Sequence, residues 1–348
     1  MLFKGGFHIG RIWHNLGWRT GIIALLWVVI ISAAHFELNM EKQGRKQITM
    51  GYMPVVTNLA SPILDYVSRD GDGVRYKSLK FSSFAEMAES LRNGQIDVAF
   101  IIAPLAIELR QQGEDVKVIY IGNRHESTLV ARKDLDVNSI YDLIGKTVAV
   151  PMRYSGHNLS ILQLIEKNGL EGRIKVVEMN PPDMAAALST GSLDAYYVGE
   201  PFAATTLRSG DSKLVHYVED VWNGFICNLV LVRQDWIEKD PLAVKAFVDG
   251  AVRSGLWAQK NTKEAVEIAS MYWNQSPELV EYALTTPRDR IIFDKYLPVE
   301  EEMQHMADLM QHFGLTENND VTGLIDDQFA NDANLQNIGG LESILPEQ

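Results

Sequence analysis

The chain has 348 residues, of which 46% are hydrophobic and 22% charged, a composition typical of a globular protein long enough for two domains of ordinary size. Its 45 acidic residues outnumber its 32 basic residues and give a net charge of −13, which disfavours nucleic acid and anionic membrane surfaces as partners. The single cysteine, Cys227, cannot form an intramolecular disulfide. It lies in an apolar run, so we interpret it as a small buried hydrophobic residue.

Residues 1–34 have the pattern of an export signal. Residues 1–20 contain Lys4, Arg11 and Arg19 but no acidic residue, and the uncharged segment 21–34 ends with small residues that suit a cleavage site. This segment is shorter than the roughly 20 apolar residues of a spanning helix. Because the basic segment before it is long, retention as an inner-membrane anchor over residues 21–36 stays open. In either case we expect the rest of the chain to lie in the periplasm.

After a polar linker at residues 35–45, strands alternate with helices, which predicts mostly parallel sheets flanked by helices. Thr57 or Asn58 is expected to cap a helix that begins near Leu59, and Asp183 is expected to cap a later one. Ser83 begins a Ser-x-x-Glu capping box. The predicted strands are 48–53, 116–121, 128–131, 147–150, 174–179 and 228–232; the other predicted helices are 157–168, 241–260, 271–285 and 298–313.

A similar sequence pattern occurs twice, at residues 91–100 and at residues 188–197. In both copies a helix ends at a glycine, a short turn reaches an aspartate, and an apolar strand follows. Each copy then runs into a proline, Pro104 or Pro201, which suits the first turn of another helix. Two similar α/β units on one chain predict two lobes that face each other across a cleft.

The order of the elements predicts that the chain crosses twice between these lobes. Residues 46–125 and 232–348 would form the first lobe around a second lobe of residues 126–231. We therefore expect an α/β fold of two lobes, each a mostly parallel sheet flanked by helices. Two crossing segments would act as a hinge behind the cleft.

Ligands of open α/β sheets bind beyond the carboxyl ends of the strands. The loop 151–158 is the richest such segment, because it supplies a helix N-terminus, a hydroxyl, a glycine that allows close approach, and an imidazole. Glu200 follows another strand and would face the same cleft. The simpler interpretation, that Ser155 only caps a helix and that Glu200 is solvated, stays open.

The sequence contains few patterns that are typical of catalysis or of metal binding. Gly145-Lys146-Thr147 resembles the end of a phosphate-binding loop, but Ile140 stands where its upstream glycine is required. The sequence contains no nucleophile elbow and no paired histidines or cysteines at ligand spacing. We therefore expect no enzyme activity, no cofactor and no metal ion.

Several segments in order resemble the solute-binding proteins of the nitrate/sulfonate/bicarbonate ABC-transporter family. The resemblance runs from Ile48 to Lys260 and is carried by residues 142–151, 157–159, 180–184, 191–195 and 198–201. It implies a type II periplasmic-binding fold. It also implies a small-molecule ligand and, as partners, a membrane permease with a cytoplasmic ATPase. We expect the protein to be a monomer.

By the same resemblance, His157 takes the place of a histidine that contacts a bound anion, and a polar residue near Glu126 or Ser127 lines the cleft. Two departures put nitrate and bicarbonate in doubt: Phe202 replaces a tryptophan, and Asn228 replaces a charged residue. Sulfonates, aminosulfonates or a heterocyclic vitamin precursor stay open as ligands. The candidate ligand-binding residues are Thr57, Asn58, Ser127, Tyr154, Ser155, Gly156, His157, Glu200 and Asn228.

Two other functions remain. One is an enzyme of the same fold, such as the lyases of menaquinone biosynthesis or the pyrimidine synthases of thiamine biosynthesis. The export signal and the absence of a cysteine cluster speak against it. The other is a membrane-anchored sensor ectodomain, which would bind its ligand without transport.

Overall fold

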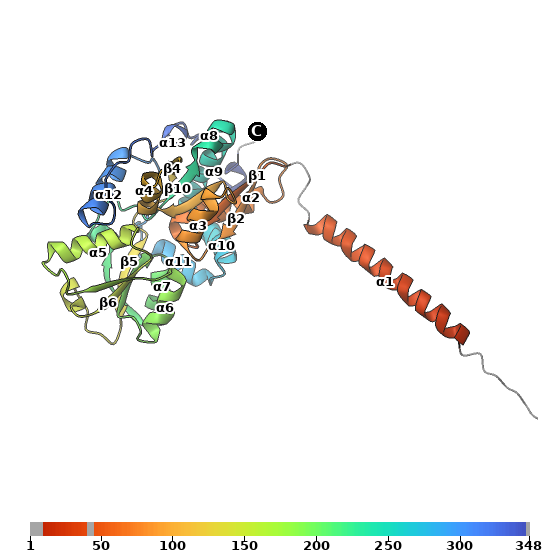
Figure 1. The fold of residues 1–348 in the computed structure, drawn as a ribbon, viewed down its shortest axis with the longest axis horizontal. Coiled ribbons are helices and arrows are strands. Elements are labelled where there is room, and N and C mark those ends of the chain that lie inside the picture. Colours follow the sequence, from red (N-terminus) through yellow and green to blue (C-terminus); the bar gives the residue numbers. More distant parts are fainter. Residues whose placement is uncertain (1–9, 40–44, 346–348) are drawn as a thin grey trace, which may run out of the picture. The chain divides into compact units, whose positions relative to one another are not determined.

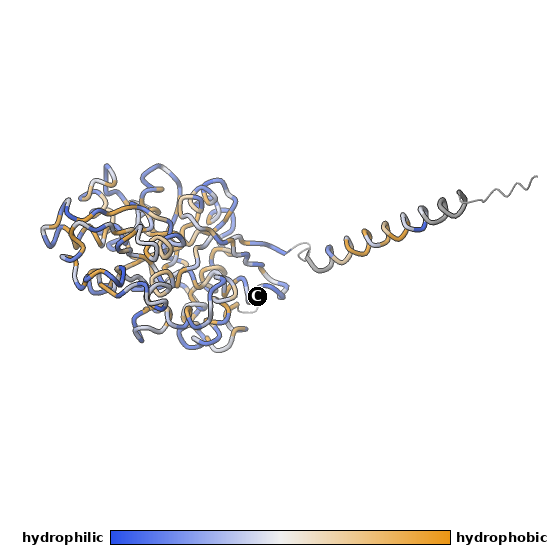
Figure 2. The backbone as a smooth tube through the Cα atoms, turned by 90° about the horizontal axis from the view of Figure 1, so that it is seen from below, coloured by the Kyte–Doolittle hydropathy of each residue, from blue (hydrophilic) through white to orange (hydrophobic). Residues whose placement is uncertain are grey.

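The computed structural model describes residues 10–39 and 45–345, and the chain divides into two units, residues 1–46 and 47–348. The first unit contains helix α1 (Gly10–Asn39). Its stretch Gly17–His35 is long and apolar enough to cross a membrane, a test that a signal sequence also passes (Figure 2). The helix is therefore compatible with the predicted signal peptide.

The second unit contains two five-stranded sheets, one in each lobe (Figure 1). Within each sheet a single strand, β10 or β5, runs against the other four. The first sheet has the order β2 (Arg75–Lys80), β1 (Gln47–Tyr52), β3 (Val98–Ile102), β10 (Asn228–Arg233), β4 (Val116–Ile121). The second has the order β7 (Lys175–Glu178), β6 (Thr147–Val150), β8 (Ala195–Gly199), β5 (Ser127–Arg132), β9 (Ser212–Tyr217). The prediction of two mostly parallel lobes is confirmed.

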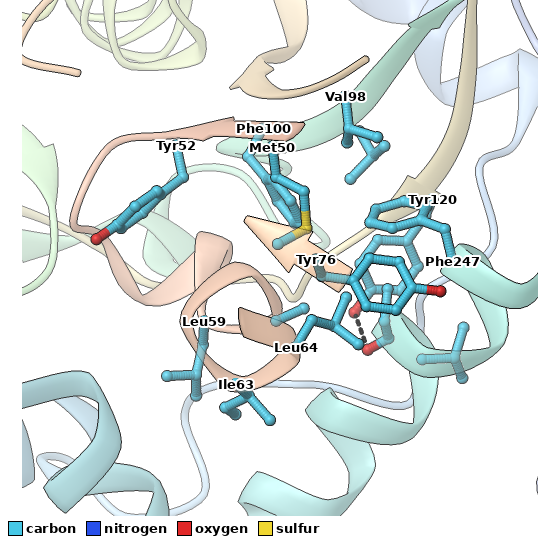
Figure 3. Close-up of a cluster of buried hydrophobic side chains, with 14 of the residues drawn as sticks. Met50, Tyr52, Leu59, Ile63, Leu64, Tyr76, Val98, Phe100, Tyr120 and Phe247 are labelled. Atoms are coloured by element: carbon cyan, nitrogen blue, oxygen red, sulfur yellow. Dashed lines mark hydrogen bonds between the residues drawn. The ribbon is translucent and has the colours of Figure 1, made fainter. Parts of the chain in front are cut away.

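Helices cover both faces of the first sheet. On one face, side chains of β1 and β3 pack against α2 (Ala60–Ser68) and α9 (Pro241–Lys260), with Phe247 beside Phe100 and Tyr76 (Figure 3). A second apolar cluster covers the other face and continues into the second lobe. The remaining helices are α3 (Phe84–Arg92), α4 (Ala103–Gln111), α5 (Gly156–Lys167), α6 (Pro181–Ser189), α7 (Phe202–Ser209), α8 (Gln234–Lys239), α10 (Thr262–Trp273), α11 (Pro277–Thr285), α12 (Glu300–His312) and α13 (Gln328–Asn331).

The repeated sequence pattern forms the same structure in both lobes. Asp97 lies between α3 and β3, and its carboxylate accepts a hydrogen bond of 2.8 Å from the backbone N–H of Thr49 on β1. Asp194 lies between α6 and β8, and its carboxylate accepts one of 2.9 Å from the backbone N–H of Thr147 on β6. Each aspartate therefore fixes the start of the neighbouring parallel strand.

An arginine on each antiparallel strand completes this arrangement. At the end of β10, Arg233 donates to the carbonyl of Leu91 (2.8 Å) at the end of α3. At the end of β5, Arg132 donates to the carbonyl of Gly191 (3.2 Å), which follows α6. A positive charge at the end of a helix complements the helix dipole. Because β5 follows β4 and β10 follows β9, each lobe receives its antiparallel strand from a crossing of the chain.

The structure corrects three local predictions. Thr57 and Asn58 cap no helix; they lie in a 3₁₀ turn, Val56–Asn58, that precedes α2. Asp183 lies in the first turn of α6, because Asn180 and the prolines after it begin that helix. Pro104 lies in the first turn of α4 as predicted, whereas Pro201 comes just before α7 and follows a cis peptide bond.

Two predicted boundaries also differ. The chain already pairs with the first sheet at Asn228, so it returns before the expected lobe boundary at residue 231. The expected helix 271–285 is interrupted by Asn274 in the left-handed conformation, and its residues belong to α10 and α11.

We expect Asp97→Ala to lower the free energy of unfolding by about 1–2 kcal/mol, because the N–H of Thr49 loses a charged acceptor in a partly buried place. Asp194→Ala should have a similar effect through Thr147. Urea unfolding of the full-length chain in mild detergent, followed by fluorescence, measures both. Glu171→Ala, at an exposed turn, is the matched control. Equal stability of all three variants would contradict the structural role of the repeat.

Candidate functional site

Buried polar side chains gather where the carboxyl ends of the parallel strands in the two lobes meet. We call this group the junction cluster; it consists of Thr57, Asn58, Glu126, Ser127, His157, Glu200, Cys227 and Asn228, all nearly or fully buried. The backbone N–H of Val56 in the first lobe donates to the carbonyl of Glu200 in the second (2.9 Å). Glu126 and Cys227 lie at the ends of the two crossing segments. The cluster therefore lies at the hinge side of the junction between the lobes.

His157 is held by the N-terminus of α5. Ser155 is the N-cap of this helix, and its hydroxyl accepts from the backbone N–H of Asn158 (3.1 Å). A Cβ atom at Gly156 would lie 2.7 Å from the ring of Phe225, so only glycine allows this close approach. The loop 151–158 thereby brings the imidazole into the junction.

The imidazole of His157 is neutral. Burial lowers its pKa to about 3. Its Nε2 lies 2.9 Å from the hydroxyl of Ser127 and 3.9 Å from the sulfur of Cys227. Its Nδ1 is buried without a hydrogen-bond partner. A buried polar atom of this kind is costly to leave unpaired, so it marks a place where a ligand group can bind.

Glu126 is fully buried between the lobes. Its carboxylate accepts from the backbone N–H of Glu200 (2.7 Å) and from the hydroxyl of Ser127 (3.3 Å). A Cβ atom at Gly199 would lie 2.7 Å from the carboxylate, so glycine is required beside it. Burial raises the pKa of Glu126 to about 7, and the nearby Glu200 adds to the rise. The Cys227 and Thr57 side chains and the Glu200 N–H lower it in part.

Glu200 and Arg290 form the second charged group of the junction. The Glu200 carboxylate accepts from the hydroxyl of Thr128 (2.7 Å) and from the N–H of Ala204 (2.8 Å). Burial raises its pKa, and Arg290, 3.9 Å away, opposes the rise. Arg290 also donates to Glu219 (2.8 Å), and its guanidinium lies over the ring of Tyr217.

In the first lobe, the side-chain amides of asparagines form a series of hydrogen bonds. Asn228 donates to the side-chain oxygen of Asn58 (2.9 Å), and the side-chain N–H of Asn58 donates to the carbonyl of Met53 (2.9 Å). The thiol of Cys227 donates to Asn228 (3.3 Å). Asn123 donates to the carbonyl of Val56 (3.0 Å), and its Oδ1 is buried without a partner. These contacts fix the amide orientations, so the orphaned atom of Asn123 is an acceptor.

Most of the predicted site residues come together, with the exception of Tyr154. Tyr154 is half-buried and donates to the carbonyl of Leu315 (3.4 Å), so it bridges the lobes outside the cluster. Arg153 is exposed and lies against the ring of Tyr154. Cys227 is buried in an apolar cluster of the second lobe, as predicted, and its sulfur also contacts the polar side chains of His157 and Asn228. Sequence reasoning missed Asn123 and Arg290, although Asn123 follows β4 at the kind of strand end where a ligand site was sought.

A cavity of about 390 Å³ lies between the lobes, next to the first residues of the loop 151–158. Its lining comes from the N-terminus of α3 in the first lobe and from β7 and α6 in the second. The lining residues are Ser83, Phe84, Ala85, Pro151, Met152, Glu178, Met179, Asn180 and Asp183. Among the residues that the structure describes, no group of three or more His, Cys, Asp or Glu side chains could hold a metal ion.

The raised pKa of Glu126 predicts a pH-dependent stability. Its pKa is about 7 in the folded chain and 4.5 unfolded, so its contribution is fully present below pH 4.5 and is lost as pH rises towards 7. We expect Glu126→Gln to gain on the order of 2–3 kcal/mol over the wild-type protein between pH 4.5 and 8. Urea unfolding at several pH values measures this gain. A constant difference between the two proteins across this range would show that Glu126 has an ordinary pKa.

Comparison with solved structures shows the fold. The ligand-binding component of an ABC-type import system from Staphylococcus aureus superposes with a TM-score of 0.75 at 20% sequence identity, over 83% of this chain and 99% of that one. A desulfurization enzyme superposes less closely, with a TM-score of 0.56 at 17% identity. The two-lobed periplasmic-binding fold is therefore confirmed, and this fold is also found in an enzyme.

Two curated relatives match parts of the sequence. The taurine-binding periplasmic protein of Escherichia coli K12 is 31% identical over 179 residues, which make up 50% of this chain and 54% of that protein. A nitrate/nitrite binding protein of Synechococcus elongatus is 23% identical over 273 residues, which make up 67% of this chain and 60% of that protein. The chain thus spans little more than half the length of these relatives.

The model of the NMT1-like family matches residues 41–272, more than half of the chain. The resemblance to the nitrate/sulfonate/bicarbonate solute-binding proteins is confirmed by this match and by the relatives named for taurine and nitrate. On these findings, the chain belongs to the NMT1-like family.

Proposed function

We propose that this chain is the extracytoplasmic solute-binding component of an ABC importer and captures a small polar solute between its lobes. The junction cluster carries the proposal. Both lobes send buried polar side chains to one place, and His157 Nδ1 and Asn123 Oδ1 are left there without partners. A solute that supplied the missing hydrogen bonds would stabilise the closed arrangement of the lobes.

Both lobes would hold the solute. Thr57, Asn58 and Asn228 would contact it from the first lobe, and Ser127, Ser155, Gly156, His157 and Glu200 from the second. Tyr154 would act on closure, since its hydroxyl reaches across the lobes to Leu315. Hydrogen bonds to charged groups in a desolvated cleft are stronger than those in water, which favours tight capture.

Closing and opening would use the two crossings of the chain as a hinge. The crossings are the segments between β4 and β5 and between β9 and β10. On the cleft side, closure would make the bond from Val56 to Glu200 and the bond from Arg208 to the carbonyl of Glu278 (2.6 Å). Since these contacts join different lobes, opening would have to break them.

The proposal includes the partners and the compartment. A membrane permease with a cytoplasmic ATPase would receive the solute, the protein would act as a monomer, and it would work in the periplasm. The family match, the names of the relatives and the apolar N-terminal helix support this assignment. We propose no enzyme activity, because the only histidine of the cluster is a neutral, buried imidazole and the relatives are named as binding proteins.

A membrane-anchored sensor is the second candidate, and one observation favours it. The stretch Gly17–His35 in α1 is long enough to span a membrane if it is not removed. The same solute site would then report on the solute instead of passing it to a permease. Mass determination of the protein isolated from cells separates the two candidates, because a cleaved N-terminus contradicts an anchor.

A ligand screen tests the proposed function directly. We expect at least one of nitrate, bicarbonate, alkanesulfonates, taurine and thiamine-type pyrimidines to raise the unfolding temperature of the full-length chain in mild detergent. A ligand at 100 times its Kd stabilises the folded state by about 2.7 kcal/mol, which corresponds to several degrees. No shift with any of these solutes would contradict the proposed solute class.

His157→Ala tests the site. We expect it to weaken binding of the solute found in the screen at least tenfold, because the imidazole contacts Ser127 at the centre of the cluster. Isothermal titration calorimetry measures the affinity, and His216→Ala on β9 is the matched control. Unchanged affinity in a folded His157→Ala protein would remove this residue from the site.

A further inference from the structure

The charged groups of the junction cluster do not suit an anion. Glu126 and Glu200 are both carboxyl groups, and both are buried. His157 is neutral, so it brings no positive charge to the site. An anion placed beside these carboxyl groups would be desolvated in a closed cleft, and any of the carboxyl groups that is ionised would repel it.

The two arginines near the cluster are already engaged. The guanidinium of Arg290 donates to Glu219, to the hydroxyl of Thr128 and to the carbonyl of Ser127, and one face lies on Tyr217. Arg124 makes a double contact with the carboxylate of Glu302 (2.6 and 2.9 Å) and donates to two backbone carbonyls. Binding an anion through either arginine would require breaking these bonds.

Three buried polar atoms at the junction have no hydrogen-bond partner: the hydroxyl of Thr57, which can donate or accept, and two atoms that act as acceptors, on His157 and on Asn123 beside the cluster. When Glu126 is ionised, the hydroxyl of Ser127 donates to it and accepts from Nε2–H of His157. That tautomer leaves Nδ1 of His157 as an unpartnered acceptor. Asn123 Oδ1 is a second unpartnered acceptor. Donors on the bound solute would complement both atoms, whereas the acceptor oxygens of nitrate or a sulfonate would not.

Resting on the proposed function, we infer that the solute presents a cationic nitrogen, as an amine or an amidine does, to the carboxylate of Glu126, with further N–H donors for His157 and Asn123. An anionic group elsewhere on the solute is compatible with this arrangement, provided that it lies away from Glu126. The inference therefore separates aminosulfonates and amino-substituted heterocycles from nitrate, bicarbonate and simple alkanesulfonates.

The inferred contact also predicts a pH dependence with a definite sign. Glu126 has a pKa of about 7, so a cation binds its ionised form and binding strengthens as pH rises. The groups that act on Glu126 are Glu200, Cys227 and Thr57; His157 contacts the neighbouring Ser127, and His125 precedes Glu126 in the chain. Burial raises the pKa of Glu200 and of the Cys227 thiol and lowers that of His157 and of His125. We expect affinity for a cationic solute to be roughly tenfold higher at pH 8 than at pH 6, through Glu126.

Matched ligand pairs test the inference on the full-length protein in mild detergent. Taurine is compared with isethionate, which has a hydroxyl in place of the ammonium group. An aminomethylpyrimidine is compared with its hydroxymethyl counterpart. Calorimetry at pH 6 and pH 8 should show at least tenfold tighter binding of the amine in one pair, tightening further at pH 8. In Glu126→Gln both the preference and the pH dependence should disappear, whereas Glu171→Gln should keep both.

The outcomes separate this inference from the function on which it rests. Binding of isethionate or the hydroxymethyl compound as tightly as its amine, or tighter binding at pH 6, would overturn the cationic nitrogen while solute binding stands. The inference of a cationic nitrogen would also be overturned if the wild-type protein bound none of the four compounds. Because the pairs are measured on the wild-type protein, the inference can fail even if Glu126→Gln does not fold.

Discussion

The burial of carboxyl groups where the two lobes meet is the constraint on which the rest of the site depends. Glu126 is fully buried and receives the N–H of Glu200, whose own carboxylate is held by Thr128 and Ala204. Charged groups lose several kcal/mol on leaving water unless hydrogen bonds and counter-charges replace it. Gly199 fits this constraint, because any side chain there would collide with the Glu126 carboxylate.

Much of the two-lobed architecture could be predicted because the sequence repeats itself where the structure does. Asp97 and Asp194 each accept a hydrogen bond from a backbone N–H of a neighbouring parallel strand. Both copies of the pattern therefore need an aspartate at the same position, just before the strand that follows the helix. The match extends to Arg132 and Arg233, which end the two antiparallel strands and donate to carbonyls at the ends of α3 and α6. Although these contacts join residues 47 to 142 positions apart, their repetition in both lobes leaves a visible trace in the sequence.

The parts that could not be predicted depend on contacts between distant segments. Asn58 was expected to cap a helix, but Asn228, 170 positions away, binds its side chain instead. Cys227 was interpreted as a buried hydrophobic residue, and its additional contact with His157, 70 positions away, could not be read from the sequence. Arg290 lies in a segment without regular periodicity, and its role follows only from its contacts with Thr128 and Glu219. Sequence spacing contains no signal for these pairings.

Arg290 links the charge of the junction to the position of the lobes. Its segment is tied to the first lobe, because Ile292 pairs with Arg124 and the carbonyl of Tyr296 accepts from Ile121 at the end of β4. The guanidinium nevertheless contacts Ser127, Thr128, Tyr217 and Glu219, which all belong to the second lobe or to the crossing beside it. Separation of the lobes would draw this positive charge away from Glu200, 3.9 Å from it in the closed arrangement. Arg290 thus supplies the counter-charge of Glu200, and Glu126 is left as the carboxyl group of the junction without a cationic partner among the described residues.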